Sequence, residues 1–195
     1  MSDNRILENI DNYIYFHHLK SLVIVPTYPD TISDTMAVNF AQSTPLGRSA
    51  PIYSFSNSGP RTINVDLKLH RELMTQVNYQ NSKLNAELND DVVDTFLKQI
   101  RASALPEYSA SSKMVNPPII SCKFGKDIFC KGVVSGAVGV SYELPIIGDG
   151  KYAYVGVSFT LQEIEPYDAS TVFEVGGYRG LTTSLERNIY KTTRR

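Results

Sequence analysis

Residues 61–71 read RTINVDLKLHR, a stretch in which apolar and polar residues alternate from Ile63 to His70. Successive side chains of a β-strand point to opposite faces of a sheet, so this alternation is typical of a strand with one buried and one hydrated face. The same period recurs in residues 154–163 and 36–40. Shorter β-rich runs lie at 22–25, 119–124 and 128–142. The sequence therefore predicts a mainly β protein.

Turn residues separate the predicted strands. Gly148–Asp149–Gly150 predicts a hairpin between the last two strands, and Ser58–Gly59–Pro60 predicts a turn just before the 61–71 strand. Cys122 and Cys130 flank another predicted turn, across which they could face each other. In a reducing compartment we expect them to be free thiols.

One helix interrupts the strands. Its apolar residues recur at helical spacing, Asn89 or Asp90 can cap its start, and Pro106 closes it. These signals predict a helix at about 90–103, whose apolar stripe consists of Val92, Val93, Phe96, Leu97 and Ile100. The polar segment 75–88 before it reads as a loop or irregular connection.

The chain divides into one β domain and two extensions. We place the domain at 19–168, an N-terminal extension at 1–18 and a basic C-terminal extension at 169–195. The N-terminal extension has apolar residues at helical spacing, but residues 13–16 fit a strand equally well. The C-terminal extension is either a solvated terminus or an arm that lies on a neighbouring subunit.

Charge and hydropathy exclude several classes of partner. Nineteen Lys and Arg against twenty Asp and Glu give a net charge of −1, so no basic field is present to hold a specific nucleic acid. The longest nearly apolar run, residues 22–25, is far too short to span a bilayer, and no secretory signal is evident at the start. We therefore expect no membrane partner and synthesis in a cytoplasm.

Residues with catalytic or metal-binding potential are few and scattered. Adjacent His17 and His18 point apart if they lie on a strand, and His70 ends the 61–71 strand on its polar face, where a solvated or hydrogen-bonded role is the default. Glu163 and Glu165 share a strand face that we expect to be solvated. The sequence offers no phosphate loop and no serine-hydrolase turn. We predict no enzyme activity, no metal and no cofactor.

The order of several weak motifs carries a resemblance. YPDTISDTM (28–36) leads to TPLGRSAPI (44–52) and then to SNSGPRTI (56–63). After the helix, NPPII (116–120) precedes the C-terminal strands, and EIEPYDA (163–169) closes the last one. Taken in this order, the chain resembles the tail-tube-like baseplate and tube-initiator proteins of long-tailed contractile phages and related contractile injection systems.

The resemblance implies a tail-tube-like β-barrel or sandwich with one flanking helix. It also implies a structural virion protein, located in the tail or baseplate, that forms a ring at the junction of tail tube and baseplate, where it initiates the tube or acts as a hub. Its partners would be copies of itself, six-fold by family analogy and sharing a continuous sheet, and neighbouring tail tube and baseplate proteins.

Three groups of residues are candidates for the subunit interface. The first is a loop in which Gly47 either supplies a turn beside a solvated Arg48 or packs with it against a neighbour. The second is an apolar hairpin tip, either buried in the core or docked on another subunit. The third is the basic terminus. The residues are Leu46, Gly47 and Arg48; Leu144, Pro145, Ile146 and Ile147; and Arg187, Arg194 and Arg195.

A second class of function also fits the composition. A carbohydrate-binding β-sandwich would need aromatic side chains clustered on one exposed face, and the twelve Tyr residues could supply them. Ring formation without glycan binding would separate the two classes.

Overall fold

In the described part of the chain, seven strands form one antiparallel sheet, which two helices accompany. The computed structural model describes residues 12–79, 81–86, 91–106, 118–125 and 127–164. The strands are β1 (Asn12–Phe16), β2 (Ser21–Ile24), β3 (Ile32–Ser43), β4 (Ile52–His70), β5 (Ile119–Phe124), β6 (Ile128–Ile146) and β7 (Tyr152–Glu163). The helices are α2 (Arg71–Asn78) and α3 (Val92–Ala102). The prediction of a mainly β protein is confirmed.

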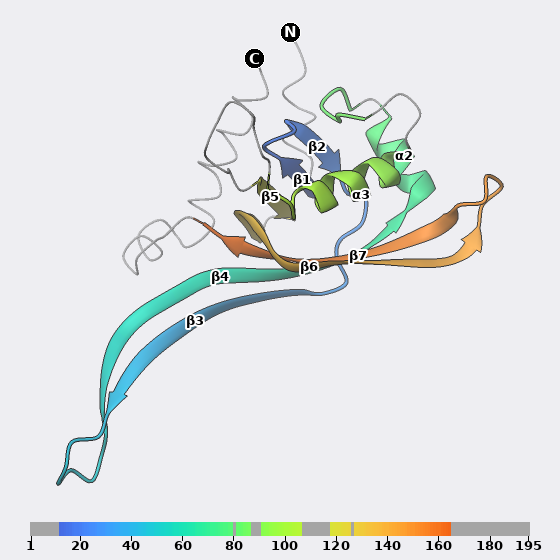
Figure 1. Ribbon diagram of the computed structural model, residues 1–195. Coiled ribbons are helices and arrows are strands. Elements are labelled where there is room, and N and C mark those ends of the chain that lie inside the picture. The colour runs from blue at the N-terminus through green and yellow to red at the C-terminus, as the bar shows by residue number, and fades with distance from the viewer. Residues whose placement is uncertain (1–11, 80, 87–90, 107–117, 126, 165–195) are drawn as a thin grey trace.

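The sheet is open, so the barrel alternative of the expected β-barrel or sandwich is not the observed one. Its order is β2-β1-β5-β6-β7-β4-β3, and its first and last strands, β2 and β3, do not pair. Figure 1 shows β1, β2 and β5 on the same side of the β6–β7–β4 strands as both helices. The sheet thus curls around a core without closing.

The core lies between the curled sheet and the helices. Alternate residues of β4 and β7 enter it, as their period predicted, and meet one face of α3. Phe96 of α3 is fully buried and its ring lies 6.1 Å from that of Phe16 on β1. The buried strand residues facing the helices are Ile63, Val65, Leu67 and Leu69 of β4 and Val155, Val157, Phe159 and Leu161 of β7.

The helix prediction is confirmed for α3 and incomplete for α2. Asp91 is the N-cap residue of α3, and the predicted caps Asn89 and Asp90 lie outside the described residues. The segment assigned to an irregular connection begins instead inside α2. The His70 side chain caps α2 by accepting a hydrogen bond from the Leu73 amide at 3.4 Å. A polar helix of 8 residues that buries only one narrow face gives a weak periodic signal.

The structure corrects the predicted start of the 61–71 strand and the predicted start of the domain. β4 runs without interruption through Ser58–Gly59–Pro60, where the sequence predicted a turn and the structure has a register shift opposite β3. Residues 12–16, assigned to the N-terminal extension, form β1 between β2 and β5. The strand alternative for residues 13–16 is therefore the observed one.

Cys122 and Cys130 face each other across β5 and β6 as buried free thiols.

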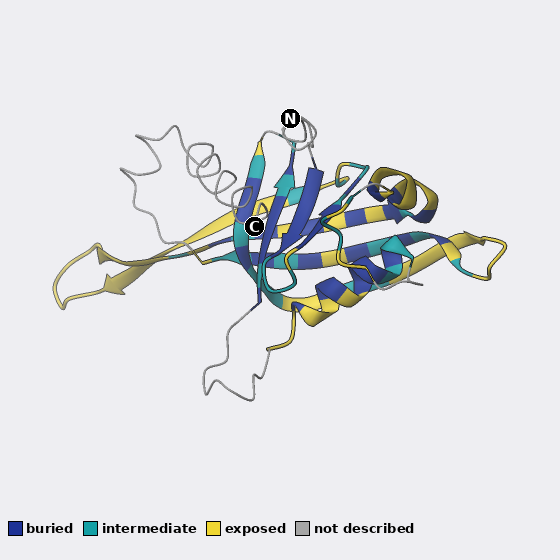
Figure 2. Cartoon of the chain, turned by 90° about the horizontal axis from the view of Figure 1, so that it is seen from above, coloured by how far each residue is buried: buried dark blue, intermediate teal, exposed yellow. Residues whose placement is uncertain are grey.

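The long strands project from the body as two hairpins. The outer parts of β3 and β4 extend from one end of the body, and the outer parts of β6 and β7 extend from the opposite end (Figure 1). Figure 2 shows that both projections are exposed, whereas the strands between them are largely buried on one face. The predicted hairpin turn at residues 148–150 lies at the second tip.

Candidate functional site

The outer edge of β3 is unpaired. β3 spans 12 residues, ends the strand order and, among the described residues, pairs only with β4. All its residues except Ile32 are exposed. A long exposed edge presents a row of peptide groups that can accept another strand. This edge is therefore a candidate surface for β-sheet extension.

β6 offers a second unpaired edge. Its pairing with β5 ends at Val133, whereas its pairing with β7 continues to Ile146. Beyond Val133, the β6 edge that faces away from β7 has no partner strand in the described part of the chain. The four strands β6, β7, β4 and β3 alternate in direction. They form an array with one open edge on each side.

The edge of β2, at the other end of the sheet, is closed by two asparagine side chains and one backbone carbonyl group. Asn78 of α2 accepts a hydrogen bond from the Ile24 amide at 3.0 Å and donates one to the Ile24 carbonyl at 2.8 Å. Asn81 donates to the Leu22 carbonyl at 2.7 Å, and the Leu22 amide donates to the Lys83 carbonyl at 3.0 Å. The outward-facing peptide groups of Leu22 and Ile24 thus form their hydrogen bonds with these groups and not with another strand. Further strand addition at β2 is therefore blocked.

An apolar strip covers one face of the β3–β4 hairpin. Val38 and Phe40 of β3 share a face with Tyr53 and Phe55 of β4, and all four are more than half exposed. The rings of Phe40 and Phe55 lie 5.8 Å apart in a T-shaped contact. The strip continues the face that is buried under the helices nearer the body. Exposed apolar surface of this extent is typical of an interaction site.

The predicted hairpin tip of β6 and β7 is also exposed. Leu144, Ile146 and Ile147 are 71%, 55% and 39% exposed, so the core does not cover them. The Leu144–Pro145 peptide bond is cis. The Ile147 amide donates a hydrogen bond to the Lys151 carbonyl at 2.8 Å, which closes the turn. Docking of this tip on another subunit stays a prediction.

The other predicted interface residues lie apart from this tip. Leu46, Gly47 and Arg48 form the loop between β3 and β4, as predicted, at the opposite end of the molecule (Figure 1). Gly47 has a φ of +85°, and the Arg48 amide donates to the Pro45 carbonyl at 3.3 Å, so the turn role of Gly47 is met. Arg187, Arg194 and Arg195 lie outside the described residues.

A buried ionic cluster stands where the β3–β4 hairpin leaves the body. The Arg61 guanidinium, only 2% exposed, donates three hydrogen bonds to the Asp34 carboxylate at 2.7–3.0 Å and lies 3.7 Å from Glu163. Burial acts to lower the pKa of Arg61. The hydrogen bonds and charge of the Asp34 carboxylate outweigh burial, so the pKa of Arg61 is raised. Glu163 is thus nearly buried beside a cation, which corrects the expectation of a solvated face for this residue, and Glu165 lies outside the described residues. The sequence did contain a signal for this cluster: Arg61 is a charged residue at a position where the alternating pattern of the strand places apolar residues.

A second ionic group ties the β6–β7 hairpin to the helices. Arg71 of α2 donates to Asp91 and to Asp94, and Lys151 donates to Asp94 at 2.7 Å. Burial would raise the pKa of Asp94, but the hydrogen bonds and charges of Lys151 and Arg71 lower it. These contacts fix the hairpin base against the helical layer.

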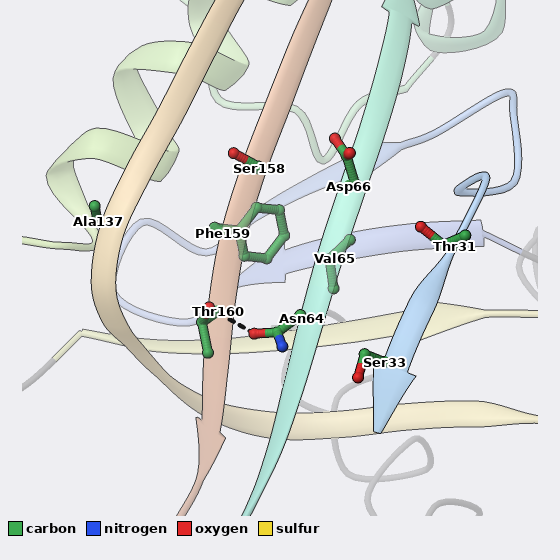
Figure 3. A pocket seen from close by; sticks show the side chains of 9 residues that line it. All are labelled: Thr31, Ser33, Asn64, Val65, Asp66, Ala137, Ser158, Phe159 and Thr160. Carbon is green, nitrogen blue, oxygen red and sulfur yellow. Dashed lines mark hydrogen bonds between the residues drawn. The ribbon is translucent and has the colours of Figure 1, made fainter. Parts of the chain in front are cut away.

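The described residues offer no catalytic constellation. A shallow pocket on the polar face of the sheet is lined largely by hydroxyl and amide groups, among which Thr160 donates to Asn64 at 2.7 Å (Figure 3). The His17 ring bonds Ser121 at 2.8 Å, and burial together with Lys131 lowers the pKa of His17 to about 4. Burial raises the pKa of Cys130 to about 12, so its thiol is a poor nucleophile. Within the described ranges, no three His, Cys, Asp or Glu residues cluster as a metal site.

No protein-family model matches the chain, and no curated protein matches it at a significant level. In the described part of the chain, no helix is long and apolar enough to cross a membrane.

Proposed function

We propose that this chain is a structural subunit that assembles edge to edge into a ring, at the junction of tail tube and baseplate in a phage-type tail. The observation that carries the proposal is the pair of open edges on the four-strand array. β3 and β6 run in opposite directions, so β3 of one copy beside β6 of the next continues the antiparallel alternation.

The two edges differ, which determines the kind of assembly. A contact between two different surfaces of identical subunits repeats head to tail and gives a closed ring when the rotation closes. The closure of the β2 edge by Asn78 and Asn81 leaves β3 and β6 as the edges for growth. A ring of this kind needs no cofactor and no enzyme activity.

The position in a phage tail rests on the order of motifs in the sequence. Projecting hairpins with apolar faces suit a protein whose surface is completed by neighbours. In the ring, the neighbours would be further copies, and tail tube and baseplate proteins would lie above and below.

Mass measurement tests the proposal. We expect light scattering and native mass spectrometry of the purified chain to give a closed oligomer, six-fold by family analogy, and negative-stain images to show rings. Charged substitution at the β3 edge, Val38→Lys, should leave a folded monomer. A wild-type chain that stays monomeric at high concentration, and also when tail partners are added, would contradict the proposal.

The alternative of a carbohydrate-binding module is supported by the exposed rings of Phe40, Tyr53 and Phe55 on the β3–β4 hairpin. A glycan-array measurement on the same protein decides it. Binding that is lost in Tyr53→Ala, without ring formation, would favour the module.

A further inference from the structure

The two open edges are offset along the strand direction. Thr35 of β3, Thr62 of β4, Gln162 of β7 and Val133 of β6 stand in one row across the array. From this row, most of β3 runs toward one end of the molecule and the unpaired part of β6 runs toward the other. The two edges therefore overlap very little at the same level.

A neighbour at the same level could not pair along β3. Residues of β3 from Met36 onward would stand level with residues of β6 at or before Gly132. Those β6 residues already pair with β5 on the edge concerned, as in Ile120↔Gly132 and Cys122↔Cys130. Ring formation through these edges thus requires each copy to be displaced along the strands relative to the next.

The extent of the edges narrows the displacement to two registers. β3 has 12 residues, and the unpaired part of β6 runs from Val134 to Ile146. All of β3 faces unpaired β6 residues only when Val38 lies opposite Gly139 or opposite Val140. Any other register leaves residues of β3 against β5 or beyond the end of β6.

The faces of the strands select one of the two. Val140 pairs with buried Val157 and faces the helices, whereas Gly139 pairs with exposed Ser158 on the polar face. Val38 lies on the helix side of β3. A shift of one residue would put every side chain on the wrong face.

We infer that Val38 of one copy lies opposite Val140 of the next, a register that rests on the proposed ring. Met36 then stands opposite Tyr142, and Phe40 stands opposite Val138. The apolar strip of one hairpin then lies beside the partly buried Val138 and Val140 of the next copy, and together they form one apolar surface on the helix side. The occupant of this part of the strip is thus a second copy of the chain.

The register also sets the inclination of the strands. Thr35 comes opposite Glu143 of the next copy, so the displacement corresponds to the β7 segment from Gln162 to Tyr154. That segment measures about 27 Å along the strand, against about 19 Å across four strands. A closed ring takes up the displacement by inclining its strands roughly 55° to the axis, steeper than the ~35–45° of most barrels.

Cysteine cross-linking of the assembled ring tests the register. The pair Val38→Cys and Val140→Cys places two thiols on directly opposed residues, whose spacing suits a disulfide. After mild oxidation we expect covalent multimers on a non-reducing gel, and none for either single variant. The native Cys122 and Cys130 are 1% exposed, so they should not contribute.

The matched control is Val38→Cys with Ser141→Cys, which puts the thiols on opposite faces. We expect this pair to stay largely uncross-linked in rings of the same size. Rings that cross-link better through Ser141, or that do not cross-link through Val140, would overturn the register while leaving the ring. A wild-type chain that forms no ring would overturn both.

Discussion

β4 is a single strand with two environments. From Arg61 to His70 its alternate residues are buried at 0–3% exposure under the helices, whereas Tyr53 and Phe55 in its outer half are 63% and 61% exposed. Both halves have large apolar side chains on the helix side, and only one half has a layer to cover them. In the described part of the chain, the body therefore covers its own apolar face, whereas the β3–β4 hairpin leaves its apolar face exposed, as expected of a surface that a partner would cover.

The ends of the sheet repeat this contrast. β2 is short and buried, and its outer peptide groups are bonded to Asn78 of α2 and to the segment after α2. β3 is long and exposed, and its outer edge has no strand beside it in the described chain. Edge strands are usually protected by charge, by proline or by a covering element. Protection of one edge alone is expected of a protein that extends its sheet in a fixed direction.

The largest difference between the two regions should appear in a matched pair of substitutions. Phe96→Ala removes a fully buried ring and should lower the free energy of unfolding by about 3–5 kcal/mol. Phe55→Ala removes an exposed ring and should change it by about 0.5–1 kcal/mol, because only the contact with Phe40 is lost. Urea unfolding of both variants measures the difference. Equal losses would show that the hairpin belongs to the core.

The boundary between the two regions should be the next most sensitive point. Arg61→Met removes the cation between Asp34 and Glu163, and we expect a loss of about 2–3 kcal/mol in the free energy of unfolding, since Glu163 is nearly buried. Lys68→Met, which breaks the exposed pair of Lys68 and Glu143, serves as the control and should have little effect. If both variants unfold at the same urea concentration as the wild type, the cluster does not hold the hairpin base.

Period-two alternation predicted the part of the fold whose faces differ. The 61–71 strand and its neighbour β7 have one buried and one polar face, so their sequence shows the pattern directly. α2 was missed because it buries only Arg71, Met74 and Asn78. The turn predicted at Gly59–Pro60 is a register shift within β4, because these residues disrupt pairing without ending the strand. Local sequence does not distinguish the two outcomes.

The candidate site was predictable only in part. The tip residues Leu144, Ile146 and Ile147 were found because apolar side chains beside a turn are unusual. The strip of Val38, Phe40, Tyr53 and Phe55 was not found, because alternation looks the same whether the apolar face is covered or not. The open edges depend on which strands pair and where pairing stops, and that information is not local in the sequence.

The free energy of unfolding should depend on pH through His17, a residue of the body. The pKa of His17 is lowered to about 4, so between pH 4 and 6.5 the unfolded chain binds a proton that the folded chain excludes. The free energy of unfolding should therefore fall as the pH drops from 7 to 5, by about 1–2 kcal/mol after allowance for solvent screening. His17→Gln should remove this part of the dependence. A wild-type curve that is parallel to that of the variant would contradict the assignment.

The smallest effect on stability, and the largest on assembly, should come from the β6–β7 tip. Ile146→Ser together with Ile147→Ser replaces side chains that are 55% and 39% exposed, so we expect the free energy of unfolding to change by no more than about 0.5–1 kcal/mol. If the tip docks on an adjacent subunit or on the next ring, the double variant should remain monomeric or fail to stack, as measured by light scattering. Asp149→Ser, in the same turn, should assemble as the wild type does. An unfolded double variant would show that the tip supports the fold, and normal assembly would show that the open edges of β3 and β6 suffice without it.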